Sequence, residues 1–174
     1  MQILRLRHIE KEIKNLIIFD RDGTLNKDYG YTFKSNELEL TEFARCIKET
    51  FQDFRFAAAI ASNQSGIARR FFQISDFEVF TRNLTDELDP SGLSFFLVAA
   101  CPHLPTAGCD CRKPKTAMLE AITNENDFKN VIMVGNSSSD MLAAKNLGIA
   151  YIDCNQVDSC KEFKEWVGMH CDHK

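Results

Sequence analysis

The sequence predicts a single α/β domain in which helices cover both faces of a mainly parallel, five-stranded sheet. Five apolar runs of strand length recur along the chain. They are continuous rather than alternating, as expected for strands buried on both faces. Segments with the apolar spacing of helices lie between these runs, and this alternation favours right-handed crossovers within a parallel sheet. A length of 174 residues suits one domain with one substantial core. We therefore expect residues 1–174 to form one three-layer sandwich.

The predicted elements alternate along the chain. Strands are expected at 15–20, 56–62, 95–100, 131–135 and 149–153, and helices at 41–51, 75–88, 116–123, 138–147 and 159–167. The helix at 75–88 opens with Ser-Asp-Phe-Glu, which resembles a capping box, and Gly148 is suited to end the helix at 138–147. Residues 1–14 form an N-terminal extension that could be a further helix or strand. The order of elements gives a Rossmann-like arrangement.

Composition and charge exclude several classes of protein. The formal net charge of −4 argues against a general nucleic-acid binder, which would carry a basic face. No apolar run is long enough to span a membrane, and the first residues do not resemble a secretory signal. Seven cysteines, three of them clustered, favour a metal site in a reducing, cytoplasmic compartment over a disulfide scaffold. Cys46, on an apolar helix face, is interpreted as a core residue.

Polar and reactive residues follow four of the predicted strands. In open parallel sheets, ligands bind beyond the carboxyl ends of the strands, so these residues should meet in one crevice. Asp20 and Asp22 flank an arginine after the first strand, and Gly23 allows the chain to turn there. An isolated motif of this kind can equally be a solvated Asp-Gly turn. Here it is accompanied by groups suited to Mg²⁺ and phosphate, which are Ser62, Asn63, Lys113, Asn136 and Asp140.

A cysteine-rich loop at 101–111 supplies a second set of ligands. Cys101, His103, Cys109 and Cys111 are the four nitrogen and sulfur ligands of a closed, tetrahedral, structural Zn²⁺ site. Four unligated side chains or a local disulfide are the alternatives. Because no ligand position is left open, zinc here should hold the loop and not act in catalysis. A weaker candidate cluster near the C-terminus, with irregular spacing, comprises Cys154, Cys160, His170, Cys171 and His173.

The four strand-end motifs together resemble the haloacid dehalogenase (HAD) superfamily of phosphatases. The resemblance spans residues 19–140 and rests on D-x-D-G-T, the serine after the second strand, the lysine, and G-x-x-x-x-D. The segments DRDGTLNKDYGY, SNQSGIAR and CPHLPTAGCDCRKP are similar to the branch that contains heptose bisphosphate and histidinol-phosphate phosphatases. The same branch has a matching zinc loop, which supports the zinc interpretation of the cysteine-rich segment.

The resemblance implies chemical roles for the carboxylates. Asp20 would be the nucleophile that forms an aspartyl-phosphate, and Asp22 would act as the general acid and then as the general base. Mg²⁺ would be held by Asp20, the backbone carbonyl of Asp22 and the side chain at position 136, with Asp140 behind these ligands. This chain has Asn136 where the family usually has aspartate. The substitution is either a tolerated variant with weaker Mg²⁺ binding or the mark of a crippled, phosphate-binding or partner-binding domain.

The remaining roles concern phosphate and substrate. Ser62, Asn63 and Lys113 would grip the phosphoryl group, and the guanidinium of Arg112 would reach a substrate phosphate. Arg69 and Arg70 could hold a distal phosphate, or they are solvated helix charges.

The gaps between motifs leave no room for a cap domain, so the site should be open and shaped by the flap at 25–35 and the zinc loop. We predict a monomeric, Mg²⁺-dependent hydrolase of a small phosphorylated metabolite. The flap and the segment NQSGIAR resemble the heptose enzymes, so we predict D-glycero-D-manno-heptose 1,7-bisphosphate, cleaved at the 7-phosphate, as the substrate. The short zinc loop is nearer in length to that of the histidinol enzymes, so histidinol phosphate is the alternative.

Overall fold

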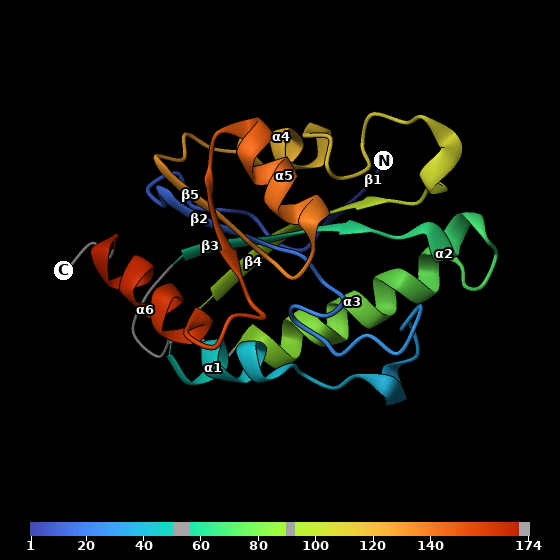
Figure 1. The fold of residues 1–174 in the computed structure, drawn as a ribbon, viewed down its shortest axis with the longest axis horizontal. Helices are drawn as coiled ribbons and strands as arrows, with labels where there is room; N and C mark the ends of the chain where they lie inside the picture. Colours follow the sequence, from blue (N-terminus) through green and yellow to red (C-terminus); the bar gives the residue numbers. More distant parts are fainter. Residues whose placement is uncertain (51–55, 90–92, 171–174) are drawn as a thin grey trace.

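A six-stranded sheet forms the centre of the molecule (Figure 1). The computed structural model describes residues 1–50, 56–89 and 93–170. The strand order is β1-β4-β3-β2-β5-β6, and all neighbours are parallel except β1 and β4. The strands are β1 (Gln2–Arg5), β2 (Asn15–Phe19), β3 (Phe56–Asn63), β4 (Leu93–Cys101), β5 (Asn130–Gly135) and β6 (Ala150–Asp153). The predicted α/β class is confirmed, with six strands instead of five.

The additional strand comes from the N-terminal extension. β1 pairs antiparallel with β4, with Gln2 opposite Ala100 and Arg5 opposite Leu97. Of its four residues only Leu4 is buried, so the segment lacks the continuous apolar pattern of the central strands. Its strand conformation depends on hydrogen bonds to a segment more than ninety residues away. Part of the extension therefore belongs to the sheet.

Helices cover both faces of the sheet (Figure 1). On one side lie α1 (Glu42–Thr50), α3 (Ile74–Leu88) and α6 (Ser159–Met169), and on the other lie α4 (Ala117–Thr123) and α5 (Ser138–Leu147). Each layer of helices packs a separate cluster of apolar side chains against one face of the sheet. On α3, the buried residues Phe77, Phe80, Leu84 and Leu88 recur at helical spacing, which explains why this helix was recognisable.

Helix boundaries differ from the prediction in a few places. The capping box of α3 uses Gln73 and Asp76, so the helix begins before the Ser75 start that was predicted. Gly148 ends α5 in the left-handed conformation with φ of 77°, as predicted. The predicted end of the first helix at residue 51 lies outside the described residues. A four-residue helix, α2 (Ser65–Ala68), follows β3 and is too short to leave a periodic pattern in the sequence.

The topology reverses direction at β2. The chain passes from β2 to β3 and β4 on one side, then returns to place β5 and β6 on the other. Loops that leave β2, β3 and β5 therefore diverge at their carboxyl ends, and this divergence opens a crevice there. None of the helices in the described parts of the chain is long and apolar enough to cross a membrane.

The cysteines outside the zinc loop correct one interpretation. Cys46 is bonded to Cys160 in a disulfide that joins α1 to α6 across 114 residues of sequence, so its assignment as a simple core residue was wrong. Cys160 is thereby removed from the candidate C-terminal cluster, and Cys171 and His173 lie outside the described residues. Within the described ranges, the zinc loop holds the one group of three or more Cys, His, Asp or Glu side chains that converge closely enough to share a metal ion.

Candidate active site

A cavity of about 420 Å³ lies at the carboxyl ends of the central strands. It brings together all the side chains that the sequence assigned to catalysis, phosphate and magnesium, which are Asp20, Asp22, Ser62, Asn63, Arg112, Lys113, Asn136 and Asp140. The flap at 25–35 contributes Asp28, Gly30 and Tyr31 to its rim. Arg69 and Arg70 are exposed and do not line this cavity.

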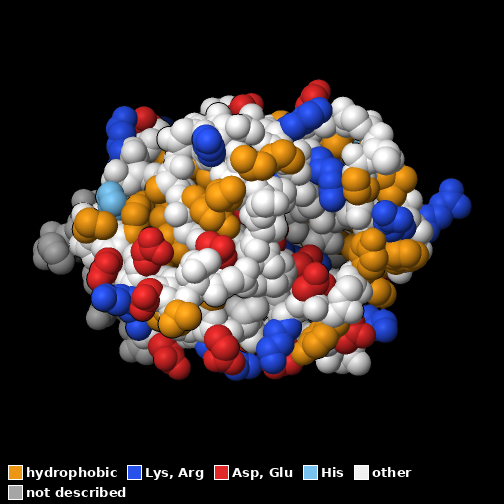
Figure 2. Space-filling view, in the orientation of Figure 1, with side chains coloured by type: hydrophobic (Ala, Val, Ile, Leu, Met, Phe, Trp, Pro, Cys, Tyr) orange, Lys and Arg blue, Asp and Glu red, His pale blue; other side chains and the backbone are white. Residues whose placement is uncertain are grey.

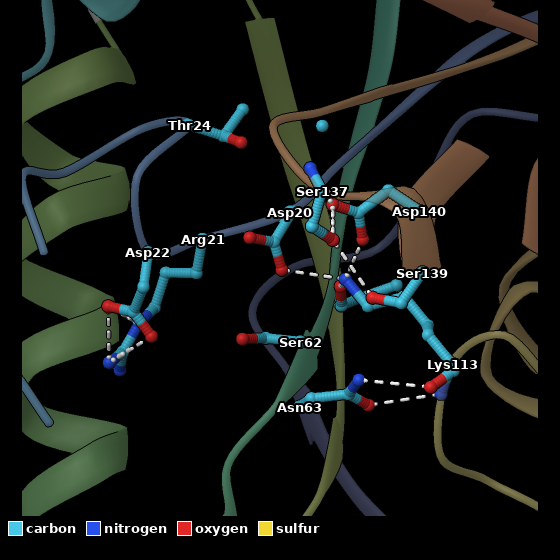
Figure 3. Close-up of polar contacts among 12 residues, drawn as sticks. Asp20, Arg21, Asp22, Thr24, Ser62, Asn63, Lys113, Ser137, Ser139 and Asp140 are labelled. Carbon is cyan, nitrogen blue, oxygen red and sulfur yellow. Dashed lines mark hydrogen bonds and ion pairs between the residues drawn. The ribbon is translucent and has the colours of Figure 1, made fainter. Parts of the chain in front are cut away.

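Asp20 and Lys113 form a buried ion pair at the floor of the cavity. Lys113 Nζ lies 2.6 Å from Asp20 Oδ1 and 2.6 Å from Asp140 Oδ1, and it donates to the Ala61 carbonyl at 2.6 Å. Figure 3 shows the Asp20 carboxylate turned toward the lysine. Burial raises the pKa of Asp20 to about 7 against the opposing attraction of Lys113. Burial disfavours the ammonium, but Asp20 and Asp140 outweigh it and raise the pKa of Lys113.

Asp140 is fixed by the start of α5. Its Oδ2 accepts hydrogen bonds from Ser137 N at 3.1 Å and from Ser137 Oγ at 2.7 Å, which completes a capping box. Gly135 leaves the space that this carboxylate needs, because a Cβ there would lie 2.5 Å from Asp140 Cβ. The cap therefore directs Oδ1 of Asp140 toward Lys113.

The turn after β2 brings Asp22 and Asn136 around Asp20. Gly23 adopts φ of 80°, and a Cβ at this position would lie 2.1 Å from Asn136 Nδ2. Only glycine allows this close approach. Asp20, Asp22 and Asn136 all line the cavity, and carboxylate, amide and backbone carbonyl oxygens are of the type that Mg²⁺ prefers. This donor set fits a magnesium ion, with one carboxylate fewer than the family pattern.

The carboxyl end of β3 and the loop that follows the zinc ligands meet at Asn63. Its Nδ2 donates to the Lys113 carbonyl at 3.2 Å, and its Oδ1 accepts from Lys113 N at 3.0 Å. Both atoms of this amide are therefore used to anchor the backbone of Lys113. Arg112 lines the same cavity, and its buried Nη1 has no hydrogen-bond partner among the described residues. An unpaired guanidinium nitrogen beside a cavity is well suited to receive an anionic oxygen.

Two residues at the predicted strand ends, Gln64 and Arg21, have contacts in the site for which the sequence predicted no role. Gln64 Nε2 donates to Asp22 Oδ2 at 2.6 Å and to Ser62 Oγ at 2.8 Å, so it connects the first two motifs. Arg21 is completely buried, although an arginine between two aspartates would be expected to lie in solvent. Both assignments depend on contacts between distant segments, which no spacing within one motif reveals.

The four predicted zinc ligands converge, with all four ligand atoms within 4.8 Å of one another. The adjacent pairs are Cys101 Sγ–His103 Nδ1 at 3.6 Å, Cys101 Sγ–Cys109 Sγ at 3.6 Å, Cys111 Sγ–His103 Nδ1 at 3.3 Å and Cys111 Sγ–Cys109 Sγ at 3.8 Å. A zinc tetrahedron with ordinary bond lengths has edges of about 3.6 Å between sulfur and nitrogen and about 3.8 Å between sulfurs. The geometry of this Cys/His cluster therefore fits zinc.

Known proteins resemble this chain in sequence and in structure. A model of the HAD-hydrolase-like family matches residues 110–153. A probable D-glycero-D-manno-heptose-1,7-bisphosphate 7-phosphatase from Thermoplasma volcanium is 36% identical over 125 residues, which cover 71% of this chain and 85% of the relative. A histidine biosynthesis bifunctional protein HisB from Campylobacter jejuni is 33% identical over 78% of this chain, but over only 40% of its own length. The crystal structure of D,D-heptose 1,7-bisphosphate phosphatase from B. bronchiseptica, complexed with magnesium and phosphate, is similar with a TM-score of 0.67. It is 32% identical, and the match covers 80% of this chain and 79% of that one.

Proposed function

This chain belongs to the HAD-like hydrolase family and is a phosphatase, and we propose that it removes the 7-phosphate of D-glycero-D-manno-heptose 1,7-bisphosphate. The observation that supports the chemistry is the buried ion pair of Asp20 with Lys113, which opens into a cavity beside Ser62 and Arg112. A carboxylate, an ammonium, a hydroxyl and an unpaired guanidinium nitrogen at one crevice form a set of groups suited to phosphoryl transfer.

The proposed reaction has two steps. An Asp20 oxygen attacks phosphorus, the bond from phosphorus to the leaving oxygen breaks, and the carboxylic acid of Asp22 gives its proton to that oxygen. The Asp22 carboxylate then takes a proton from water as the water oxygen attacks phosphorus and the bond to Asp20 breaks. Lys113, Ser62 and Arg112 hold the phosphoryl and substrate oxygens in place. Magnesium, when bound by Asp20, Asn136 and the Asp22 carbonyl, supplies positive charge that offsets the phosphate charge.

The mouth of the cavity supports a substrate with a sugar ring. Tyr31 lines the cavity and packs edge-on against Phe71 at 4.8 Å between ring centroids, while 41% of Tyr31 and 55% of Phe71 remain exposed. Figure 2 shows hydrophobic and basic side chains gathered on the side of the molecule that carries α2. An apolar edge next to phosphate-binding groups suits the C–H face of a phosphorylated sugar. The relatives from T. volcanium and B. bronchiseptica carry the heptose name, which favours this substrate over histidinol phosphate.

Phosphate release in the presence of Mg²⁺ tests the proposal. The substrate panel consists of both anomers of the heptose bisphosphate, histidinol phosphate and fructose bisphosphate. We expect the heptose bisphosphate to give the highest kcat/KM and Asp20→Asn to lose all turnover. Asp127→Asn is a matched control, because this exposed carboxylate pairs with Lys129 near the amino end of β5 and lies outside the cavity. Preferential turnover of histidinol phosphate would overturn the substrate assignment.

Asn136 favours a second candidate, a phosphate-binding or partner-binding domain that has lost turnover. The missing carboxylate would weaken the hold on magnesium while Ser62, Arg112 and Lys113 still bind the anion. Calorimetry with inorganic phosphate separates the two functions. Phosphate binding without hydrolysis of any ester in the panel would support the second candidate, and Mg²⁺-dependent turnover would exclude it.

We further propose that the Cys/His cluster holds a structural zinc ion. The loop has little apolar surface of its own, and Pro105, Thr106 and Ala107 are exposed. Ligation can replace the missing packing. Arg112 and Lys113 follow Cys111 directly, so zinc would position the two cationic residues of the cavity. Elemental analysis of protein purified without chelator should give about one zinc per chain.

A further inference from the structure

Arg21 is a completely buried charge that the two-step reaction does not use. Its guanidinium carbon lies 5.0 Å from the ring centroid of Phe77 and 4.9 Å from that of Phe80, so two phenyl rings of α3 enclose it. Nη1 also reaches Thr81 Oγ1 at 3.5 Å. Because a guanidinium does not lose its proton in proteins, its N–H groups in such a place need hydrogen-bond acceptors.

Asp22 supplies such acceptors through a fork of hydrogen bonds. Arg21 Nε donates to Asp22 Oδ1 at 3.0 Å, and Nη2 donates to Oδ1 at 2.8 Å and to Oδ2 at 2.9 Å. Figure 3 shows the Asp22 carboxylate turned toward this guanidinium, on the other side of the cavity from Lys113. Since a carboxylate held at both oxygens by one planar group has little freedom to rotate, Arg21 determines its orientation.

Further contacts connect the Asp22 carboxylate to the cavity and the flap. Asn26 Nδ2 donates to Oδ1 at 3.0 Å, and Gln64 Nε2 donates to Oδ2 at 2.6 Å. The Asp22 side chain is still 20% exposed, on the cavity side. Nη2 of Arg21 also donates to the Thr32 carbonyl at 2.7 Å, so one guanidinium binds both the carboxylate and the flap.

We propose that Arg21 is a positioning residue that sets the orientation of the Asp22 carboxylate for proton transfer and links it to the flap. The inference rests on the proposed function, in which Asp22 is the general acid and base. Arg21 is enclosed by α3 and does not reach substrate, so it acts only through Asp22 and the flap. The rate of proton transfer from Asp22 depends steeply on the orientation of its carboxyl group, whereas the attack of Asp20 on phosphorus does not involve the Asp22 side chain.

Because Arg21 acts on proton transfer and not on the attack by Asp20, we can predict which step of the reaction an Arg21 variant slows. A sugar ester has a poor leaving group, so bond cleavage needs the proton from Asp22. An aryl phosphate such as p-nitrophenyl phosphate releases a stabilised aryloxide, which leaves without that proton. Hydrolysis of the aspartyl-phosphate needs Asp22 as base with either substrate. Loss of Arg21 should therefore leave the first step intact for the aryl ester alone.

The test compares Arg21→Met, Arg21→Lys and the control Thr81→Val, which loses only the 3.5 Å contact to Nη1. With the heptose bisphosphate, we expect Arg21→Met to lower kcat about 10- to 100-fold with KM within about twofold of wild type. Rapid mixing with p-nitrophenyl phosphate should give a burst of about one nitrophenolate per active site at close to the wild-type rate, followed by slow turnover. Arg21→Lys keeps the charge without the fork and should recover part of kcat. Thr81→Val should match wild type.

Several outcomes would overturn the inference. A folded Arg21→Met with wild-type kcat on the sugar ester would do so, as would a rise in KM without a fall in kcat. A burst rate that falls as much as the steady-state rate would indicate general damage to the site. Where Arg21→Met fails to fold, as judged by circular dichroism, a wild-type kcat in Arg21→Lys overturns it instead. A wild-type protein that hydrolyses neither ester would refute the proposed function itself, and the inference with it.

Discussion

Replacement of Lys113 by methionine should destabilise the fold by about 3–5 kcal/mol at pH 7. The ammonium lies 2.6 Å from both Asp20 and Asp140, and only 1% of its side chain is exposed. At an effective dielectric constant of about 20, each of these pairs contributes about 6 kcal/mol of gross attraction. The cost of removing three charges from water offsets much of this sum. Methionine fills similar space but leaves two buried carboxylates facing each other without a cation, so the net penalty remains large.

Urea unfolding in buffer without added Mg²⁺ measures this penalty, because no magnesium is then available to replace the ammonium. Lys129→Met, at an exposed lysine that pairs with Asp127, is the matched control and should change the free energy of unfolding by less than about 0.5 kcal/mol. The double variant Lys113→Met with Asp140→Asn should recover about 2 kcal/mol or more, since one carboxylate is then neutral. A single variant within about 1 kcal/mol of wild type, or no recovery in the double variant, would refute the reasoning.

The penalty should also depend on pH. Burial already raises the pKa of Asp20 to about 7 in the folded protein, and loss of Lys113 removes the main effect that lowers it. A carboxyl whose folded pKa is raised destabilises the fold above that pKa, and the penalty is relieved as pH falls toward the unfolded value. Wild type and Lys113→Met therefore differ in bound protons mainly above pH 7, and the difference between their free energies of unfolding should grow as pH rises from 7 to about 9. A constant difference over this range would contradict the charge argument.

Three further predictions concern the metal sites and the packing at the strand ends. Chelation that removes all zinc from the Cys/His cluster should raise KM about tenfold or more, because Arg112 loses its support, and unchanged kinetics in protein shown to lack zinc would refute this. Asn136→Asp should lower the Mg²⁺ concentration for half-maximal activity about tenfold or more, because an added charge near the ion attracts it by several times the ~1.4 kcal/mol that a tenfold change requires. An unchanged requirement would show that the charge at this position does not matter. Gly135→Ala should cost about 1–3 kcal/mol of stability and reduce kcat, since its Cβ would displace Asp140, and a wild-type urea midpoint would contradict it.

The elements that the sequence predicted well are those whose environment is uniform. β2 and β3 are buried along almost their whole length, and burial on both faces leaves a continuous apolar run that can be read directly. β1 has one buried residue in four, and its pairing partner lies far along the chain. Gln73 is not a usual capping residue, so the serine two residues later was a more persuasive but incorrect start for α3. The missed features are thus those decided by tertiary contacts.

The same distinction holds at the candidate site. Parallel topology alone places the ends of β2, β3 and β5 together, so residues just beyond them could be assigned to one cavity from the sequence. The environment of Arg21 could not be predicted, because Phe77 and Phe80 belong to a helix more than fifty residues later. The Cys46–Cys160 disulfide was missed for the same reason, since it spans 114 residues between two helices.

The charges of the site suggest why asparagine at position 136 is compatible with phosphatase activity. Asp20 and Asp140 share the one ammonium of Lys113, and Asp22 is already paired with Arg21. Asp28 on the rim offsets Arg112, so the cavity keeps negative charge for a divalent cation. A further carboxylate at position 136 would attract magnesium more strongly but would also repel phosphate whenever the ion is absent. The inhibition constant of inorganic phosphate should therefore vary little with Mg²⁺ concentration in wild type and steeply in Asn136→Asp. If the two proteins show the same dependence, the charge at position 136 does not govern the balance between cation and phosphate binding.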